Sequence, residues 1–361
     1  MFQRTLALTF LLGFVGTITA QTSKTAAQRR LDARVPIWLK VFNVTGVGIA
    51  YIENGRISWT GFYGVQFDGG PKANPSTLYS VASLTKPITA EIALRLASAG
   101  VLSLDEPIWP YWIDADIHDN PWNKLLTPRL CLSHQTGFTN WRYQTKNVLQ
   151  FQKQPGTAFG YSGEGFDYLA HFLEKKTGSS LEQLAQERVF QPIGMNDTSY
   201  TPQSWWKDRQ AKPVEAVGRK KWSAADLLRA TVGDYARFAV SVMHNEGLTE
   251  EIAEERQQIT RNLTSPEQES VLCEAAKRPD HCKVETGFGL GWHIVRINEE
   301  TILDHTGADS DVKTFVFLVP RRGIGAVIFT SGSDVGHAII DRILPVLYPD
   351  PVYAGTLWPS P

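Results

Sequence analysis

The sequence predicts a mixed α/β fold, with one sheet assembled from both ends of the chain and a helical lobe inserted between them. Strand-like segments cluster near residues 47–63 and 292–330, and helical patterns dominate the stretch that separates them. The 361 residues suit one large domain with a sizeable core. Strands at both ends share one sheet to bury their apolar faces, so the helical stretch must leave the sheet and return to it.

Alternating apolar residues and turn residues define the expected strands. At the N-terminal end, residues 47–52 and 57–63 flank Asn54-Gly55, which is typical of a hairpin with a type I′ turn. Four further strands are expected at residues 292–297, 301–305, 312–319 and 324–330, and a helical pattern over 335–347 closes the fold. Pro320 and Gly323 mark the turn between the last two of these strands.

Start and stop signals divide the middle of the chain into helices. Four are expected, at residues 86–98, 165–176, 180–189 and 232–244. Gly100 and Gly178 follow the first two as stop signals. Ser180 and Gln183 form a capping-box pattern at the start of the third helix, and Thr231 is the expected cap of the fourth.

The first 20 residues have the layout of a secretory signal peptide. Arg4 precedes an apolar run at 6–15, and Ala20 offers a small residue for cleavage. The run is about ten residues, too short for the roughly 20 that span a bilayer, so export to the periplasm or the medium is expected. A membrane anchor and a buried N-terminal strand are the alternatives. No later apolar run is long enough to span a membrane.

Charge and cysteine usage set further expectations. The net charge is −1 without blocks of like charge, so neither nucleic acid nor an anionic membrane is an expected partner. The charged and polar stretch 246–283 predicts an excursion over the surface. Within it, Cys273 and Cys282 are expected to form a disulfide in an oxidising compartment, whereas Cys131 is expected to be a small buried hydrophobe. The eight histidines lack metal-ligand spacing, so no metal or other cofactor is expected.

One candidate catalytic pair is Ser83 with Lys86. Positions i and i+3 share a face of a helix, so the ammonium would lie within reach of the hydroxyl. Pro87 supports a helix start, because proline is tolerated in the first turn. The same spacing occurs at 204–207 and 310–313. Ser83 is favoured because an apolar segment leads into it and a long helix follows.

Several short motifs follow one another along the chain. They are Tyr-Ser-Val-Ala-Ser-Leu-Thr-Lys-Pro at 79–87, Leu-Ser-His-Gln-Thr-Gly at 132–137, Pro-Gly-Thr at 155–157, Tyr-Ser-Gly at 161–163, the stretch 192–198, Gly-Phe-Gly-Leu-Gly-Trp at 287–292 and His-Thr-Gly at 305–307. In this order they resemble the motifs of the β-lactamase-related serine hydrolases, which include class C β-lactamases, D-alanyl-D-alanine carboxypeptidases and similar esterases. The similarity covers roughly residues 35–347, and the segment 79–87 corresponds to the family's nucleophile segment.

The resemblance implies an antiparallel sheet, a mostly helical second lobe and an active site between them. Residues 21–361 would form a single catalytic domain, with an α/β lobe at about 35–85 and 285–350 and a helical lobe at about 86–284. Ser83 would be the nucleophile, Lys86 the base in acylation and Tyr161 a second base or proton relay. The backbone N–H groups of Ser83 and Ala308 would form the oxyanion hole. The expected substrate-binding residues are Gly163, His305, Thr306 and Gly307.

Two departures from the family pattern favour an esterase. Gly163 replaces an amide side chain of the Tyr-x-Asn element, and His305 replaces the usual lysine of Lys-Thr-Gly. A histidine with an ordinary pKa near 6.5 carries positive charge mainly below that value. Both changes weaken recognition of a peptide-like amide and of a substrate carboxylate, so a small ester or amide is the expected substrate. A β-lactamase or D-Ala-D-Ala carboxypeptidase acting on β-lactams or cell-wall peptides, and a non-catalytic penicillin-binding-type sensor, are the alternatives. The sequence leaves the oligomeric state open.

Other residues that could belong to a catalytic site are interpreted as structural. The pair Asp304-His305 could suggest a Ser-His-Asp triad, but adjacent residues on a strand point to opposite faces, so Asp304 is poorly placed to orient the His305 ring. Ser162 lies in a near-match to a nucleophile elbow and is rejected because Glu164 takes the final glycine position. His134 is expected to make hydrogen bonds behind the site. Trp141 and Trp222 are expected to line the cleft by their family positions.

Overall fold

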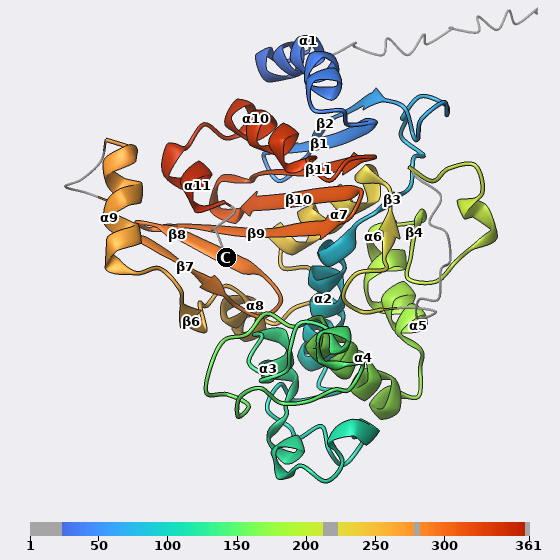
Figure 1. The fold of residues 1–361 in the computed structure, drawn as a ribbon, viewed down its shortest axis with the longest axis vertical. Coiled ribbons are helices and arrows are strands. Elements are labelled where there is room, and N and C mark those ends of the chain that lie inside the picture. Colours follow the sequence, from blue (N-terminus) through green and yellow to red (C-terminus); the bar gives the residue numbers. More distant parts are fainter. Residues whose placement is uncertain (1–23, 212–222, 278–281, 358–361) are drawn as a thin grey trace, which may run out of the picture.

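The computed structural model describes residues 24–211, 223–277 and 282–357, so the predicted signal segment lies outside it. Within these ranges, eight antiparallel strands form one sheet in the order β2-β1-β11-β10-β9-β8-β7-β6 (Figure 1). Their bounds are β1 Gly46–Glu53, β2 Arg56–Gly64, β6 Arg261–Asn262, β7 Val284–Phe288, β8 His293–Ile297, β9 Glu300–Asp309, β10 Val312–Val319 and β11 Ile324–Ser331. A small sheet joins β3 Tyr79–Ser80, β5 Arg229–Ala230 and β4 Thr198–Ser199.

The two ends of the chain meet in the large sheet, as the sequence predicts. Strand β1 pairs with β11, with Ile49 opposite Ile328. The β1–β2 turn has positive φ at both Asn54 and Gly55, 54° and 68°, which confirms the type I′ hairpin.

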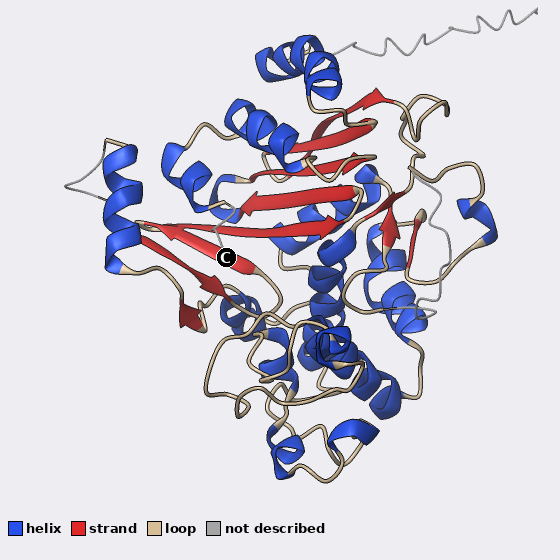
Figure 2. Ribbon diagram, viewed as in Figure 1, coloured by secondary structure: helices blue, strands red, loops and turns tan. Residues whose placement is uncertain are grey.

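Helices cover both faces of the sheet (Figure 2). One face carries α1 Ala26–Val41, α10 His337–Leu347 and α11 Pro351–Thr356, with α9 Pro266–Ala275 beside the β7 end. The other helices are α2 Thr85–Ser98, α3 Pro128–Leu132, α4 Gly163–Thr177, α5 Leu181–Ala185, α6 Gln191–Ile193, α7 Val232–Met243 and α8 Glu250–Arg256. Alternate residues of β10 enter two separate cores: Phe315 and Phe317 on one side, Val316 and Leu318 on the other.

The predicted caps of the middle helices are confirmed. Ser180 and Gln183 make the reciprocal contacts of a capping box at α5. The Thr231 side chain accepts a hydrogen bond from the Asp234 N–H at the start of α7. Gly178 ends α4 in the left-handed conformation. Local sequence signals therefore define where these helices begin and end.

The stretch 246–283 lies largely on the surface, as expected: apart from Ala253, Arg256 and Cys273, its described residues are exposed or half-buried. It contains α8, β6 and α9, of which the sequence analysis anticipated none. Arg256 is fully buried in an ion pair with Glu91, with 2.8 Å between Nη1 and Oε1. The polar composition gave no sign of this buried charge, which is tolerated because it is paired. No helix in the described ranges is long and apolar enough to cross a membrane.

Candidate active site

Ser83 lies in a tight turn between β3 and α2, within a short 3₁₀ segment, Ala82–Leu84. Ala82 has a φ of 48°, in the left-handed region that non-glycine residues rarely occupy. Hydrogen bonds hold the turn on both sides: Val81 N–H donates to the Leu228 carbonyl at 3.1 Å, and Thr314 Oγ1 donates to the Val81 carbonyl at 2.8 Å. Strained backbone of this kind persists only where the surroundings fix it, and it clusters at active sites.

Lys86 lies in the first turn of α2 and is fully buried. Its Nζ is 3.1 Å from Ser83 Oγ and 3.0 Å from the Ala225 carbonyl oxygen. The i, i+3 spacing therefore brings the amine and the hydroxyl into direct contact. The hydrogen bond to the Ala225 carbonyl helps to hold the amine in this position.

Two aromatic rings cover this amine. The Tyr161 ring centroid is 4.8 Å from Lys86 Nζ, and a Trp141 ring centroid is 5.6 Å away. Tyr161 stacks in turn on His134, with 4.3 Å between ring centroids. The Ser83, Lys86 and Tyr161 side chains predicted from sequence thus converge on one place.

Trp141 explains the glycine at position 163. A Cβ placed on Gly163 would lie 2.5 to 2.7 Å from three atoms of the Trp141 indole, closer than any real contact. The indole therefore occupies the space into which a side chain at 163 would extend. The apolar indole of Trp141 therefore lies beside Lys86, where the family pattern has an amide side chain.

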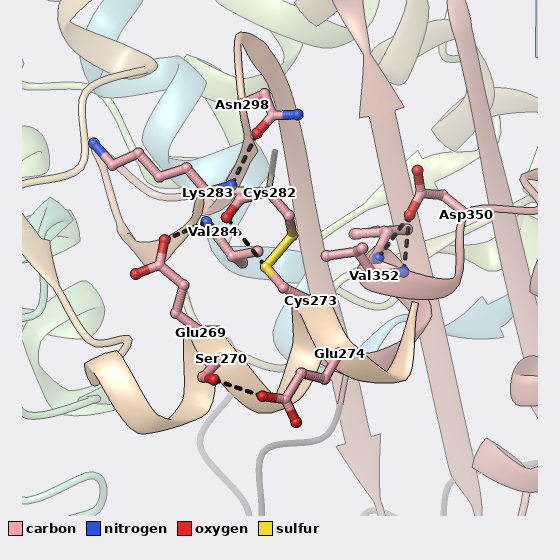
Figure 3. Close-up of a disulfide and its surroundings, with 11 residues drawn as sticks. Glu269, Ser270, Cys273, Glu274, Cys282, Lys283, Val284, Asn298, Asp350 and Val352 are labelled. Carbon is pink, nitrogen blue, oxygen red and sulfur yellow. Dashed lines mark hydrogen bonds between the residues drawn. A yellow bond between two sulfur atoms is a disulfide. The ribbon is translucent and has the colours of Figure 1, made fainter. Parts of the chain in front are cut away.

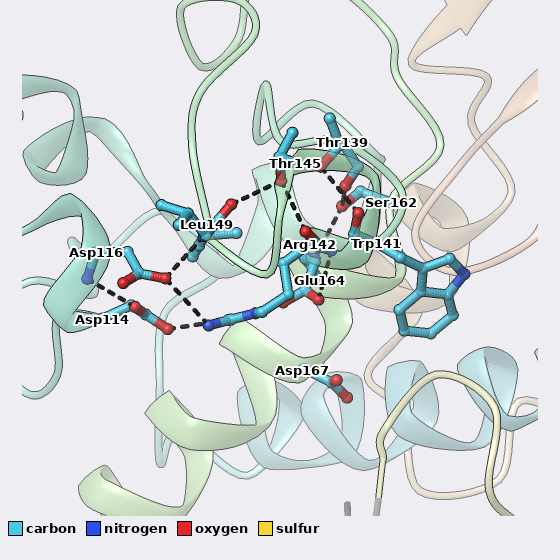
Figure 4. Close-up of polar contacts among 12 residues, drawn as sticks. Asp114, Asp116, Thr139, Trp141, Arg142, Thr145, Leu149, Ser162, Glu164 and Asp167 are labelled. Atoms are coloured by element: carbon cyan, nitrogen blue, oxygen red, sulfur yellow. Dashed lines mark hydrogen bonds and ion pairs between the residues drawn. The ribbon is translucent and has the colours of Figure 1, made fainter. Parts of the chain in front are cut away.

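A polar network holds the segment that carries Trp141 (Figure 4). The neighbouring Arg142 donates from its backbone N–H and from Nε to the carboxylate of buried Glu164, at 3.0 and 2.9 Å. Its Nη2 reaches Asp114 at 3.0 Å. Because Glu164 is in the first turn of α4 next to Gly163, this ion pair fixes the loop against the helix start.

His134 and Ser162 have structural roles, as expected. His134 Nδ1 accepts a hydrogen bond from the Ser162 N–H at 3.1 Å, and burial lowers the pKa of His134 well below its ordinary value. Ser162 caps α4: its Oγ accepts from the Gly165 N–H at 3.0 Å and donates to the Thr139 carbonyl at 2.8 Å. Ser162 is therefore already engaged on both its donor and acceptor sides.

Strand β9 forms the other wall of the site. It pairs with β8 only as far as Asp304, so the edge of β9 from His305 onward is open toward Ser83. Gly307 packs directly on the turn that carries Ser83, where an added Cβ would collide with Val81 O and Thr314 Oγ1 and lie 3.2 Å from Ser83 N. The close approach of the two backbones requires glycine here. Ala308, the other predicted oxyanion donor, follows Gly307 and is exposed.

His305 is not the titrating cation that its sequence position predicted. It is buried, and its Nδ1 donates to the Thr306 carbonyl at 2.7 Å. Burial, together with the nearby Lys86, lowers the pKa of His305 to about 3. The expectation of positive charge below pH 6.5 is therefore wrong. Within the described residues, its buried Nε2 has no hydrogen-bond partner.

Asp304 turns away from His305, as expected for neighbours on a strand. Its carboxylate is 2.7 Å from His293 Nδ1 and accepts a hydrogen bond from Tyr353 Oη at 2.9 Å. Asp304 and His305 therefore do not form a Ser-His-Asp triad with Ser83.

The third Ser-x-x-Lys match does not pair its own serine and lysine: Lys313 donates to the Asp309 carbonyl at 2.7 Å. Trp222 lies outside the described residues. Cys273 and Cys282 are joined in a disulfide at the end of α9 (Figure 3). Cys131 is a buried free thiol, and burial raises its pKa.

A comparison with protein-family models matches residues 41–344 to the Beta-lactamase family. The chain belongs to this family of serine hydrolases. That membership and the antiparallel sheet agree with the resemblance seen in the sequence motifs.

Relatives of this β-lactamase-family chain are distant. Protein flp of Staphylococcus aureus (strain MW2) is 22% identical over 84% of this chain, which spans only 63% of that relative. The D-alanyl-D-alanine-carboxypeptidase/endopeptidase AmpH of Escherichia coli is 23% identical, with 80% of each chain covered. Among solved structures, the octameric penicillin-binding protein homologue from Pyrococcus abyssi has a TM-score of 0.70 at 19% identity, covering 90% of this chain and 78% of the other. The D-alanine carboxypeptidase AmpC from Burkholderia cenocepacia has 0.69 at 18%, covering 89% and 98%. These structural similarities show the fold.

Sequence reasoning missed the support behind Lys86. Ala225 acts through its backbone carbonyl, so its side chain carries no signal. Asp167 on α4 holds this segment, accepting hydrogen bonds from Ala224 N–H at 2.8 Å and from Ser223 Oγ at 3.0 Å. Asp167, a carboxylate within the helix predicted at residues 165–176, was the only sequence signal of this support.

Proposed function

We propose that this β-lactamase-family protein is an exported hydrolase that cleaves small esters through an acyl-enzyme on Ser83. The observation that carries the proposal is the 3.1 Å contact between Lys86 Nζ and Ser83 Oγ at a strained strand-to-helix turn. A hydroxyl becomes an effective nucleophile when an adjacent base takes its proton.

The proposed reaction has two stages. Lys86 accepts the Ser83 proton as Oγ attacks the ester carbonyl carbon, and the N–H groups of Ser83 and Ala308 bind the resulting oxyanion. The carbon–oxygen bond to the alcohol then breaks, and Lys86 returns the proton to the leaving alkoxide, directly or through Tyr161. Water attacks the acyl-enzyme in the same way, releasing the acid and restoring the Ser83 hydroxyl.

The two departures from the family pattern support an ester rather than a peptide substrate. The Trp141 indole fills the space beside Gly163, so no amide at this position can pair with a substrate amide. His305 is neutral at physiological pH, because its pKa is about 3. A neutral imidazole gives a substrate carboxylate little electrostatic attraction.

A second candidate is a D-Ala-D-Ala carboxypeptidase or β-lactamase. It is favoured because the related AmpH is a D-alanyl-D-alanine-carboxypeptidase/endopeptidase and the similar Burkholderia cenocepacia structure is a D-alanine carboxypeptidase. A non-catalytic penicillin-binding-type sensor is the third. The signal-like N-terminus supports export for all three. The Cys273–Cys282 disulfide also supports it, since such bonds persist in oxidising compartments.

The test is intact-mass spectrometry after exposure to a p-nitrophenyl ester, a penicillin, a cephalosporin and a D-Ala-D-Ala peptide, with turnover of each measured in parallel. We expect rapid turnover of the ester. Turnover confined to the peptide or to the β-lactams would assign the second function. A stable adduct without turnover of any substrate would assign the sensor.

A further inference from the structure

A cavity of about 730 Å³ adjoins the catalytic site, within the range of pockets that bind small ligands. Tyr161, His305 and Thr306 belong to both. Much of the remaining wall is apolar and comes mainly from elements that the sequence did not predict, including Phe159, Phe288, Leu263, Val271, Leu272 and Leu357, while polar groups such as Glu267 and Asp304 also line it. An apolar group attached to a substrate at Ser83 therefore has a neighbouring space to enter.

The outer wall is helix α9, which is held against the rest of the fold at three points, of which Figure 3 shows the disulfide and the Glu269–Val284 hydrogen bond. The disulfide joins Cys273 to Cys282, and Glu269 Oε1 accepts a hydrogen bond from the Val284 N–H of β7 at 3.0 Å. On the other side Gly355 of α11 lies so close that an added Cβ would be 2.7 Å from Leu272 Cδ2. Helix α9 is thus a fixed surface, although apolar side chains at the cavity remain in solvent: Val271 of α9 is 64% exposed, and Leu263, just after β6, is 40% exposed.

The charges around the cavity disfavour an anion. No lysine or arginine lines it in the part of the chain that the structure describes. Glu267 is at the exposed rim, and hydrogen bonds from its own backbone N–H and from Ser265 lower the pKa of this carboxyl. Asp304, at the inner end, is held by His293 and Tyr353. A carboxylate would meet two acidic groups and a neutral His305.

We propose that this cavity holds an uncharged apolar arm of the ester substrate, and that it selects such esters over substrates carrying a carboxylate there. The inference rests on the proposed ester hydrolysis and adds the substrate class. Burying each additional methylene in such a pocket strengthens binding about three- to fourfold.

The first experiment measures binding without hydrolysis. Nile red, a neutral dye, is bound to the full chain and displaced with 1-butanol, 1-octanol or octanoate. We expect 1-octanol to displace it at much lower concentration than 1-butanol, and at least tenfold lower than octanoate. Val271→Trp should fill the mouth of the cavity and weaken the binding of 1-octanol at least tenfold. Val41→Trp, at the end of α1 and 68% exposed, is the matched control and should change nothing.

A second pair of variants tests charge instead of bulk. Leu263→Glu should weaken the binding of 1-octanol at least fivefold. Val101→Glu is the control and should not weaken it, because Val101 is similarly exposed, at 38%, but lies beyond the far end of α2. Binding that is equal in wild type, Val271→Trp and Leu263→Glu, or octanoate binding as tightly as 1-octanol, would overturn the proposal.

The kinetic arm links the cavity to the reaction. Two neutral ester series are compared, p-nitrophenyl esters of lengthening acids and acetate esters of lengthening alcohols. In at least one series kcat/KM should rise with chain length in wild type and Val41→Trp but not in Val271→Trp. If neither series responds while acetate is still cleaved, the cavity proposal fails and ester hydrolysis stands. If alcohol binding depends on the variants but no ester turns over, the proposed function fails and the cavity stands.

Discussion

The catalytic centre and the apolar cavity share Tyr161, His305 and Thr306, yet they are built differently. In the centre, Lys86 and Ser83 are three residues apart and their contact follows from one turn of helix. In the cavity, a disulfide ties α9 to the segment before β7, and α9 packs against Gly355 of α11 from a distant part of the chain. The contrast teaches that the proposed reaction chemistry depends on local backbone geometry, whereas the proposed substrate choice depends on long-range packing.

The largest expected effect comes from removing the nucleophile while leaving the cavity intact. Ser83→Ala should lower ester turnover at least about a thousandfold, the scale found when a covalent nucleophile is lost. Displacement of Nile red by 1-octanol should not change. Ser310→Ala, in the competing Ser-x-x-Lys match, is the control and should retain activity. Near-normal turnover in Ser83→Ala would refute the assignment.

The next test separates a base from a fixed charge. Lys86→Arg keeps a positive charge but cannot deprotonate, so its acylation rate should fall about a hundredfold or more, close to that of Lys86→Ala. The rate is measured by stopped-flow release of p-nitrophenol. If arginine supports more than about a tenth of the wild-type rate, Lys86 acts only electrostatically and Tyr161 becomes the leading base.

The disulfide tests the cavity side of the comparison. Replacing both Cys273 and Cys282 by serine should lower the free energy of unfolding by about 2–3 kcal/mol, from the chain entropy of a short closed loop. Urea unfolding measures the loss. Because α9 lies beside the cavity rather than at Ser83, p-nitrophenyl acetate should be cleaved at nearly the wild-type rate while the preference for long chains declines. Both thiols found free in protein from its native compartment would contradict the assignment.

Trp141 and Gly163 test how tightly the centre is packed. Gly163→Asn forces a side chain into the indole and should destabilise the protein by about 1–3 kcal/mol. Adding Trp141→Ala should recover part of this loss, a non-additivity that a double-mutant cycle measures by urea unfolding. Purely additive effects would show that the indole does not occupy this space.

The smallest expected effect is the absence of a pH response at His305. Its pKa of about 3 leaves it neutral from pH 5.5 to 8. The ratio of kcat/KM for a carboxylate-bearing ester over a neutral ester should therefore stay flat across that range. His305→Lys should raise the ratio by adding a cation. A wild-type ratio that falls steeply between pH 5.5 and 8 would show that His305 titrates there.

The sequence predicted the parts of the molecule that short-range patterns determine. The type I′ turn at Asn54-Gly55, the caps at Ser180 and Thr231 and the strands from both chain ends all have local signals. The Ser83–Lys86 contact follows in the same way from its spacing.

What the sequence did not reveal depends on burial and distant partners. His305 reads as an ordinary histidine until its burial beside Lys86 is known. The stretch that forms α8 and α9 has a polar composition, and only its contacts, such as Arg256 with Glu91, place it against the core. The carbonyl of Ala225 has no side-chain signature at all. Each of these features arises from tertiary packing that no single-segment pattern encodes.

The most direct test of the central claim is peptide mapping of the covalent intermediate. The protein is quenched in acid during turnover of a slowly deacylating p-nitrophenyl ester, digested and analysed by tandem mass spectrometry. We predict one acyl group, attached to Ser83, which is absent from Ser83→Ala and strongly reduced in Lys86→Ala. An acyl group on Ser162, Ser204 or Ser310, or ester turnover with no covalent adduct in any peptide, would contradict it.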